Sequence, residues 1–355
     1  MQTKLLASLG ILLSFGVNAQ STPAIDPATP PPLPKTMVSI GDSITAGAVA
    51  SLSRAQLYNP LYLFKLLSTL GEVVFKWSAY GAVQDRHLSW ASGLNSNFSV
   101  KSHAHRLAYL HSRAGTQIQV GSVSWSGDTS YDLEVQVDRA LEWNKTRSAD
   151  GGPDYVTILI GANDICADDV KDMSEDREFY NNVNTAISRL IEANPNAHVV
   201  ISSLPDVNTL NSVARNSRLM GVYPYAKCED FWRKVNLCRT LTRMPEGSLD
   251  RYLVGEKVLA YNRILRDIAT ETNAHTGMQN VKYAPTTYTK AFTDKDISVD
   301  CFHPNQKGQN ILADATWNDG FWAKGWSDKD FDKHIKKVKR ERAKKHHPLG
   351  PPHHR

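Results

Sequence analysis

The chain has 355 residues, of which 41% are hydrophobic and 9% aromatic, proportions typical of a globular protein with a substantial core. The net charge of +5 is misleading, because residues 333–355 carry nine Lys and Arg against one acidic residue, leaving −3 for the remainder. The composition therefore excludes a protein that is basic throughout, and no nucleic-acid partner is predicted. No internal apolar run has the length that a membrane-spanning helix needs.

The N-terminus has the pattern of a targeting segment. Lys4 precedes an apolar run over residues 5–17, which is too short to span a bilayer, and small residues follow up to Ala19. This pattern predicts a signal peptide over residues 1–19 and a secreted or periplasmic protein, with a membrane anchor as the alternative. Residues 20–34 are rich in proline and predict an extended linker.

A single domain is predicted over residues 35–332, because no internal repeat or second linker interrupts this stretch. Short strand-like apolar runs alternate in it with longer helical patterns, which is typical of a parallel sheet covered by helices on both faces. Strands are predicted over residues 36–40, 116–124, 155–160, 198–202 and 281–284. Helices are predicted over residues 57–70, 128–144, 177–193, 251–270 and 304–317, the last with Pro304 in its first turn.

Three stretches lie outside this alternation. The long segments 81–114 and 206–247 are interpreted either as insertions that shape a site or as surface decoration. Residues 333–355 form a like-charge run, which predicts a basic disordered tail. Such a tail either contacts an anionic surface or only keeps the protein soluble.

Four cysteines in an exported chain indicate two disulfides, since their spacing fits no zinc pattern. Sequence leaves all three pairings open. We favour Cys228 with Cys238, which closes a short loop, and Cys166 with Cys301, which joins two segments expected to border the site.

Four polar segments follow predicted strands, and they carry the candidate site. Ser43 follows the first strand, Gly127 the second and Asn163 the third, while Asp300 and His303 lie after the fifth. Because the carboxyl ends of parallel strands meet at one edge of a sheet, we expect these residues to gather there.

These residue types predict acyl transfer by a serine nucleophile. A serine hydroxyl needs a base, and His303 is the candidate, with Asp300 three residues earlier to orient the imidazole. The backbone N–H groups of Ser43 and Gly127 and the side-chain amide of Asn163 are candidate donors to the oxyanion. Taken singly, each motif has an ordinary alternative: a turn glycine, a helix cap or a surface Asp-x-x-His loop.

Other candidate groups have simpler interpretations. Ser126 is the alternative nucleophile, but its surroundings are typical of an oxyanion turn. Four aspartates between residues 164 and 172 indicate a solvated helix start rather than a cation site. Four histidines between residues 87 and 111 have no ligand spacing. The sequence therefore predicts neither a metal nor a cofactor.

In order and spacing, the four segments resemble the blocks of the SGNH hydrolases, the GDSL-type esterase and lipase superfamily. The resemblance covers residues 36–317, and Ile44 stands where the family usually has Leu. It implies a three-layer α/β/α flavodoxin-like domain with a central parallel sheet of about five strands. It also implies a Ser–His–Asp mechanism through an acyl-enzyme, without a metal.

Residues 85–90, 161–166 and 300–303 are similar to the phospholipase-B-like branch, although His87 stands where that branch usually has Gly. Pro304 instead resembles the general bacterial pattern. The sequence thus predicts a secreted serine esterase and favours a lipid acyl ester as substrate. The alternatives are an acetylated or acylated carbohydrate ester and a non-catalytic binding module on the same fold.

Overall fold

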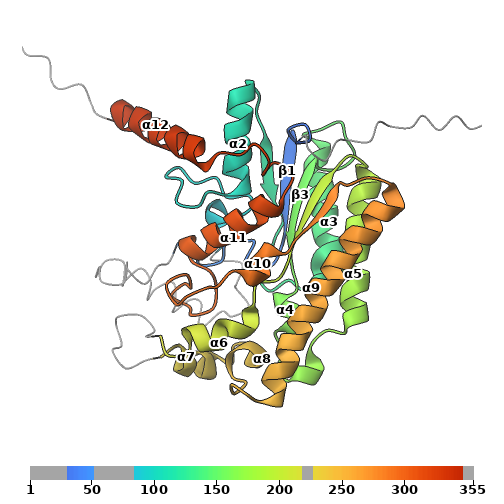
Figure 1. Ribbon diagram of the computed structural model, residues 1–355, viewed down its shortest axis with the longest axis vertical. Coiled ribbons are helices and arrows are strands. Elements are labelled where there is room, and N and C mark those ends of the chain that lie inside the picture. The colour runs from blue at the N-terminus through green and yellow to red at the C-terminus, as the bar shows by residue number, and fades with distance from the viewer. Residues whose placement is uncertain (1–29, 52–83, 218–226, 347–355) are drawn as a thin grey trace, which may run out of the picture.

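The computed structural model describes residues 30–51, 84–217 and 227–346. At its centre lies a sheet of five parallel strands in the order β2-β1-β3-β4-β5 (Figure 1). The strands are β1 (Thr36–Gly41), β2 (Gln119–Ser122), β3 (Tyr155–Leu159), β4 (His198–Ser202) and β5 (Val281–Ala284). The strand order is that of flavodoxin-like proteins, so the predicted fold class is confirmed.

Helices cover both faces of the sheet, as the buried strands require. Every residue of β1 and β3 is buried, and both strands are apolar runs with few polar residues. Helices α3 (Leu133–Lys145), α5 (Asp176–Ala193) and α9 (Leu249–Thr276) pack on one face (Figure 1). Helices α2 (His103–Ala114) and α11 (Gln306–Asp319) pack on the other.

Shorter elements fill the connections. They are η3 (Arg86–Leu88), η4 (Ser130–Asp132), α4 (Ala162–Ile165), η5 (Val170–Asp172), η6 (Val207–Thr209), α6 (Leu210–Ala214), α7 (Cys228–Val235), α8 (Arg239–Thr242), α10 (Thr286–Thr289) and α12 (Asp328–His346). Among the residues with coordinates described, no helix combines the length and apolar character needed to cross a membrane.

Most of the predicted strands and helices are present near their predicted positions, but their ends are shifted. The second strand is shorter than predicted, and the helix predicted from residue 128 begins as η4 before α3. The helix predicted over 57–70 lies outside the described residues. The placement of Pro304 was wrong: the N-cap of α11 is Asn305, whose side chain accepts from the backbone N–H of Lys307 at 2.8 Å.

The segment 81–114 contains α2, which the sequence analysis did not predict. Ser102 caps this helix by accepting from the backbone N–H of His105. His103 is fully buried, and its ring nitrogens lie 2.6 Å from the Tyr155 hydroxyl and 2.8 Å from the Thr316 hydroxyl. His103 therefore has a structural role, because it links β3 to α11 inside the core.

The prediction of a disordered tail was wrong for residues 333–346, which form most of α12. The side chains of Phe331 and Ile335 are buried, and the Tyr109 ring of α2 contacts that of Phe331. This apolar stripe docks the helix on the domain, so the predicted boundary at residue 332 falls inside an element. The end of the linker also packs on the domain, where Trp322 Nε1 donates to the Pro31 carbonyl at 3.1 Å.

The favoured disulfide pairing was also wrong. The structure joins Cys166 to Cys238 and Cys228 to Cys301, with Cα separations of 4.9 and 5.6 Å. Helix α7 explains the error, because it begins at Cys228 and ends before Cys238 and so separates the two cysteines of the expected short loop.

Candidate active site

Ser43 lies in a tight turn that directly follows β1. The turn begins at Gly41, whose φ of +145° and crowded surroundings require glycine: a Cβ there would lie 2.2 Å from the Leu159 carbonyl oxygen. The Asp42 carboxylate then accepts from the backbone N–H of Ile44 at 2.8 Å. These constraints present the Ser43 side chain at the carboxyl edge of the sheet.

The structure brings Ser43, His303 and Asp300 together in a continuous chain of hydrogen bonds. His303 Nε2 lies 2.9 Å from Ser43 Oγ, and His303 Nδ1 lies 2.5 Å from Asp300 Oδ2. The other Asp300 oxygen accepts from the backbone N–H groups of Phe302 and His303, at 3.0 and 3.1 Å. All three side chains are buried, with residue exposures of 6%, 2% and 9% for Ser43, His303 and Asp300.

Two contacts that sequence reasoning missed hold the histidine loop against the serine turn. Ser298 Oγ donates to the Val49 carbonyl at 2.7 Å. Gln309 Nε2 donates to the Ile44 carbonyl at 2.9 Å, and Gln309 is fully buried on α11. The only signal for Gln309 was a polar residue on the core-facing side of a predicted helix.

The candidate oxyanion donors lie at the same edge. The backbone N–H of Trp125 donates to the Gly41 carbonyl at 3.0 Å, which places the turn containing Gly127 beside the serine turn. Within the described ranges, neither the Ser43 N–H nor the Gly127 N–H has a hydrogen-bond partner. Asn163 Nδ2 donates one hydrogen to the Asp128 carbonyl at 2.8 Å, which leaves its second hydrogen available.

Gly127 is required by its backbone rather than by crowding. Its φ of +92° favours glycine, and in the described part of the chain no atom beyond its two chain neighbours lies within 4 Å of the position that a Cβ would take.

A buried glutamine connects the serine turn to the turn that contains Gly127. Gln136 Oε1 accepts from the Gly41 N–H at 2.8 Å, and its Nε2 donates to the Gly41 carbonyl and to Asp128 Oδ2, at 3.0 and 2.6 Å. Asp164 braces the same turn by accepting from the backbone N–H and hydroxyl of Ser130, at 2.9 and 2.6 Å.

The carboxyl groups beneath the site are strongly affected by burial. Burial raises the pKa of Asp42 to about 7, even though its bond to the Ile44 N–H and the nearby His303 lower it. Burial also raises the pKa values of Asp128 and Asp164, in each case against the hydrogen bonds described above.

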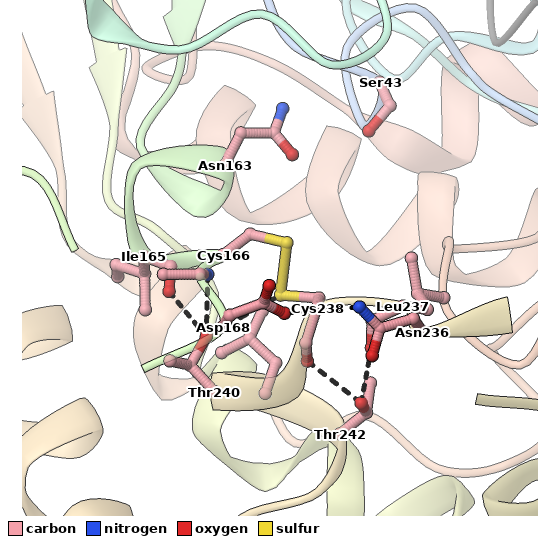
Figure 2. Close-up of a disulfide and its surroundings, with 12 residues drawn as sticks. Ser43, Asn163, Ile165, Cys166, Asp168, Asn236, Leu237, Cys238, Thr240 and Thr242 are labelled. Atoms are coloured by element: carbon pink, nitrogen blue, oxygen red, sulfur yellow. Dashed lines mark hydrogen bonds between the residues drawn. A yellow bond between two sulfur atoms is a disulfide. The ribbon is translucent and has the colours of Figure 1, made fainter. Parts of the chain in front are cut away.

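An apolar cavity opens beside Ser43 and His303. Asn163 lines it as well, whereas Gly127 does not. Its apolar walls are Val207, Leu210, Val213, Leu241, Phe292 and Phe302. Four of these residues come from the segment 206–247, so this segment shapes the site. Figure 2 shows the Cys166–Cys238 disulfide of this region, with Ser43 and Asn163 on the same side of it.

Residues 37–316 match the family model described as GDSL-like Lipase/Acylhydrolase. The chain belongs to this family. It is therefore a carboxylic ester hydrolase, and the resemblance stated from the four motifs is confirmed.

No curated protein matches the chain, but solved structures of other esterases are similar to it. A catalytic mutant of Axe2, an acetylxylan esterase from Geobacillus stearothermophilus, shares 16% identity, with a TM-score of 0.41 over 80% of this chain and 93% of that one. The esterase EstA from a Pseudoalteromonas species shares 13% identity (TM-score 0.39; 80% and 96% covered). An extracellular lipase from Streptomyces rimosus shares 14% (TM-score 0.40; 79% and 100% covered).

The remaining candidate groups of this GDSL hydrolase are not assembled into a site. Ser126 Oγ is buried and has no hydrogen-bond partner in the described part of the chain, so no base activates it there. The part of the chain that the structure describes contains no cluster of three or more His, Cys, Asp or Glu side chains that could hold a metal ion.

Proposed function

We propose that this GDSL hydrolase is a secreted serine esterase with Ser43 as nucleophile, His303 as general base and Asp300 as the residue that orients His303. The observation that carries the proposal is the pair of hydrogen bonds joining these three side chains, at 2.9 and 2.5 Å. It is the arrangement that nucleophilic serine catalysis requires.

In the first step, Ser43 Oγ attacks the ester carbonyl while His303 Nε2 takes its proton. The negative charge on the carbonyl oxygen is stabilised by the backbone N–H groups of Ser43 and Gly127 and by Asn163 Nδ2. The imidazolium then gives its proton to the leaving alcohol. In the second step His303 activates a water molecule, which releases the acid from Ser43.

The cavity beside Ser43 supports a lipid acyl ester, of the phospholipase or lysophospholipase type, as substrate. Its apolar walls suit an aliphatic acyl chain, because burying the chain there removes apolar surface from water and so favours binding. The second candidate is an acylated carbohydrate, supported by the exposed rings of Trp125 and Tyr131, at 42% and 76% exposure.

A series of p-nitrophenyl esters of rising acyl length separates these two substrates. We expect kcat/KM to rise beyond the acetyl ester, and Val213→Phe, which narrows the cavity, to shift the preference to shorter chains. Val135→Phe, at an exposed position on α3, is the matched control. A preference for acetyl esters, unaltered by Val213→Phe, would instead favour the carbohydrate substrate.

The nucleophile is tested with a fluorophosphonate probe, which reacts with activated serines. We expect the wild type and Ser126→Ala to be labelled, and Ser43→Ala to be neither labelled nor active while its melting temperature stays near that of the wild type. Labelling of Ser43→Ala would refute the assignment, and an unlabelled wild type would favour a non-catalytic binding module.

Export is proposed from the signal-peptide pattern over residues 1–19, and the two disulfides support an oxidising compartment. We expect the mature protein, purified from culture medium or periplasm, to begin at Gln20. N-terminal sequencing checks this cleavage site.

The basic segment at the C-terminus is proposed to contact anionic surfaces. Helix α12 exposes lysines and arginines along the side away from Phe331, and Figure 1 shows it extending from the body of the domain. We expect a variant with Lys336, Lys339 and Arg340 changed to Gln to bind phosphatidylglycerol vesicles less at low salt. Lys145→Gln, on α3, is the control, and equal binding by both variants would refute the contact.

A further inference from the structure

Arg86 lies between the two turns that carry the reacting groups. The backbone N–H of Asp85 donates to the Gly47 carbonyl at 3.3 Å, which ties η3 to the turn after Ser43. Arg86 Nη2 donates to the Ser124 carbonyl at 2.9 Å, which ties the same side chain to the oxyanion turn. The guanidinium is therefore held at the flank of the site.

The described partners of the Arg86 guanidinium do not include an acidic residue. Among the described residues no carboxylate forms an ion pair with it; its partners are the Ser124 carbonyl and the ring of Trp125, whose centroid lies 5.6 Å away. Its Nε is shielded from solvent and has no hydrogen-bond partner among the residues that the structure describes. Burial, and secondarily the like charge of Arg139, lower the pKa of Arg86. A partly buried cation in this state favours an incoming anion.

This cationic flank is separate from the apolar cavity. No residue between 84 and 131 lines that cavity, which is built from segments beyond residue 160 together with Ser43 and Ile44. An ester bound at Ser43 with its acyl chain in the cavity thus has the cavity on one side and the oxyanion turn, with Trp125 and Arg86, on another. The alcohol part of the ester then lies outside the cavity, on the side of Trp125 and Arg86.

We propose that Arg86 and Trp125 form a subsite for a phosphate group on the leaving alcohol, as in the headgroup of a lysophospholipid or phospholipid. A phosphate oxygen would accept from the guanidinium, and the exposed Trp125 ring would cover the glycerol carbons. This inference rests on the proposed function and adds to it the chemistry of the leaving group.

The test compares two substrates with the same acyl chain, lysophosphatidylglycerol and the neutral monoacylglycerol. The measured quantity is the ratio of kcat/KM for the anionic substrate to kcat/KM for the neutral one. We expect Arg86→Gln to lower this ratio by about tenfold or more, the range for a hydrogen bond to a charged group. Arg86→Lys, which keeps the charge without the planar fork, is expected to lie between Arg86→Gln and the wild type.

Arg147 offers a matched control. Its guanidinium also lies over a tryptophan, 4.4 Å from the Trp143 ring centroid, and also donates to a backbone carbonyl, but it lies just beyond α3. Arg147→Gln should leave the ratio as in the wild type. A merely structural Arg86 would lower both kcat/KM values alike and leave the ratio unchanged, and that result would overturn the proposal.

Glycerol 3-phosphate and inorganic phosphate supply a second measurement on the wild type, which covers the case that Arg86→Gln does not fold. Competitive inhibition by glycerol 3-phosphate, weakened in Arg86→Lys, supports a headgroup subsite. Inhibition by inorganic phosphate with equal hydrolysis of both lipids indicates a free-anion site instead and overturns the headgroup assignment. Activity of Ser43→Ala on the monoacylglycerol would mark failure of the proposed function itself, separately from these outcomes.

Discussion

Asp300→Asn tests the proposed mechanism at the residue that orients the base. In the wild type, Asp300 Oδ2 accepts the hydrogen of His303 Nδ1, so Nε2 keeps a lone pair for the Ser43 proton. The asparagine oxygen can take over the bonds from the backbone N–H groups of Phe302 and His303. Its amide nitrogen then faces Nδ1 and donates to it, which moves the ring hydrogen to Nε2.

With the hydrogen on Nε2, His303 cannot accept the Ser43 proton. We expect kcat to fall by about 10⁴, equivalent to about 5.5 kcal/mol of activation free energy. Because the two backbone bonds survive, the melting temperature should change little. The assay is steady-state hydrolysis of a p-nitrophenyl ester at neutral pH, with thermal unfolding measured on the same preparations.

Asp296→Asn is the matched control for this experiment. Asp296 accepts from the backbone N–H and hydroxyl of Thr293, at 2.9 and 2.7 Å, and its carboxylate makes no described bond to His303. It should retain wild-type kcat. If Asp300→Asn keeps activity within tenfold of the wild type while Ser43→Ala is inactive, the orienting role of Asp300 is refuted.

Three further predictions follow from the same contacts. Asn163→Ala should lower kcat by about 10²–10³ with little change in KM, and an unchanged kcat would remove Asn163 from the oxyanion hole. Asp42, with its pKa raised from 3.8 to about 7, stays protonated in the folded protein while the unfolded chain ionises. The free energy of unfolding should therefore fall as pH rises from about 4 to 7, by up to about 4 kcal/mol. Asp42→Asn, which can still accept from the Ile44 N–H, should flatten this slope in urea titrations; parallel curves would contradict it. Replacing Cys228 and Cys301 by Ser opens a loop with a sequence separation of 73 and should cost about 4 kcal/mol in the same titrations, and a much smaller loss would contradict the pairing.

The sheet and the meeting of Ser43 with His303 could be predicted because local patterns carry them. The runs over β3 and β4 are short, mostly apolar and separated by helical patterns, and a parallel sheet follows from that alternation. Once the sheet is parallel, residues that follow its strands share an edge. This geometry brought together residues that lie 260 positions apart in sequence.

The errors arose where the structure depends on contacts between distant segments. Disulfide pairing depends on where residues 206–217 and 227–247 pack against the site, and no local pattern in these residues specifies that placement. The helix α12 is different, because its signal was present: Phe331, Ile335 and Val338 repeat at helical spacing within the charged run. The tail was predicted to be disordered because of its charges, but the apolar stripe is what packs the helix on the domain.

The corrected disulfides explain how short helices can form the wall of the candidate acyl cavity. Helices α6 and α8, which line the cavity, and α7, which carries Cys228, have 5, 4 and 8 residues, too few to be stable on their own. Each disulfide joins this segment to the catalytic region rather than closing a loop within it: Cys166 lies three residues after Asn163, and Cys301 lies between Asp300 and His303. The covalent links therefore hold the cavity wall in register with Asn163, the candidate oxyanion donor, and with the histidine loop. Reduction should disturb substrate fit and catalysis together, because the same two bonds position both.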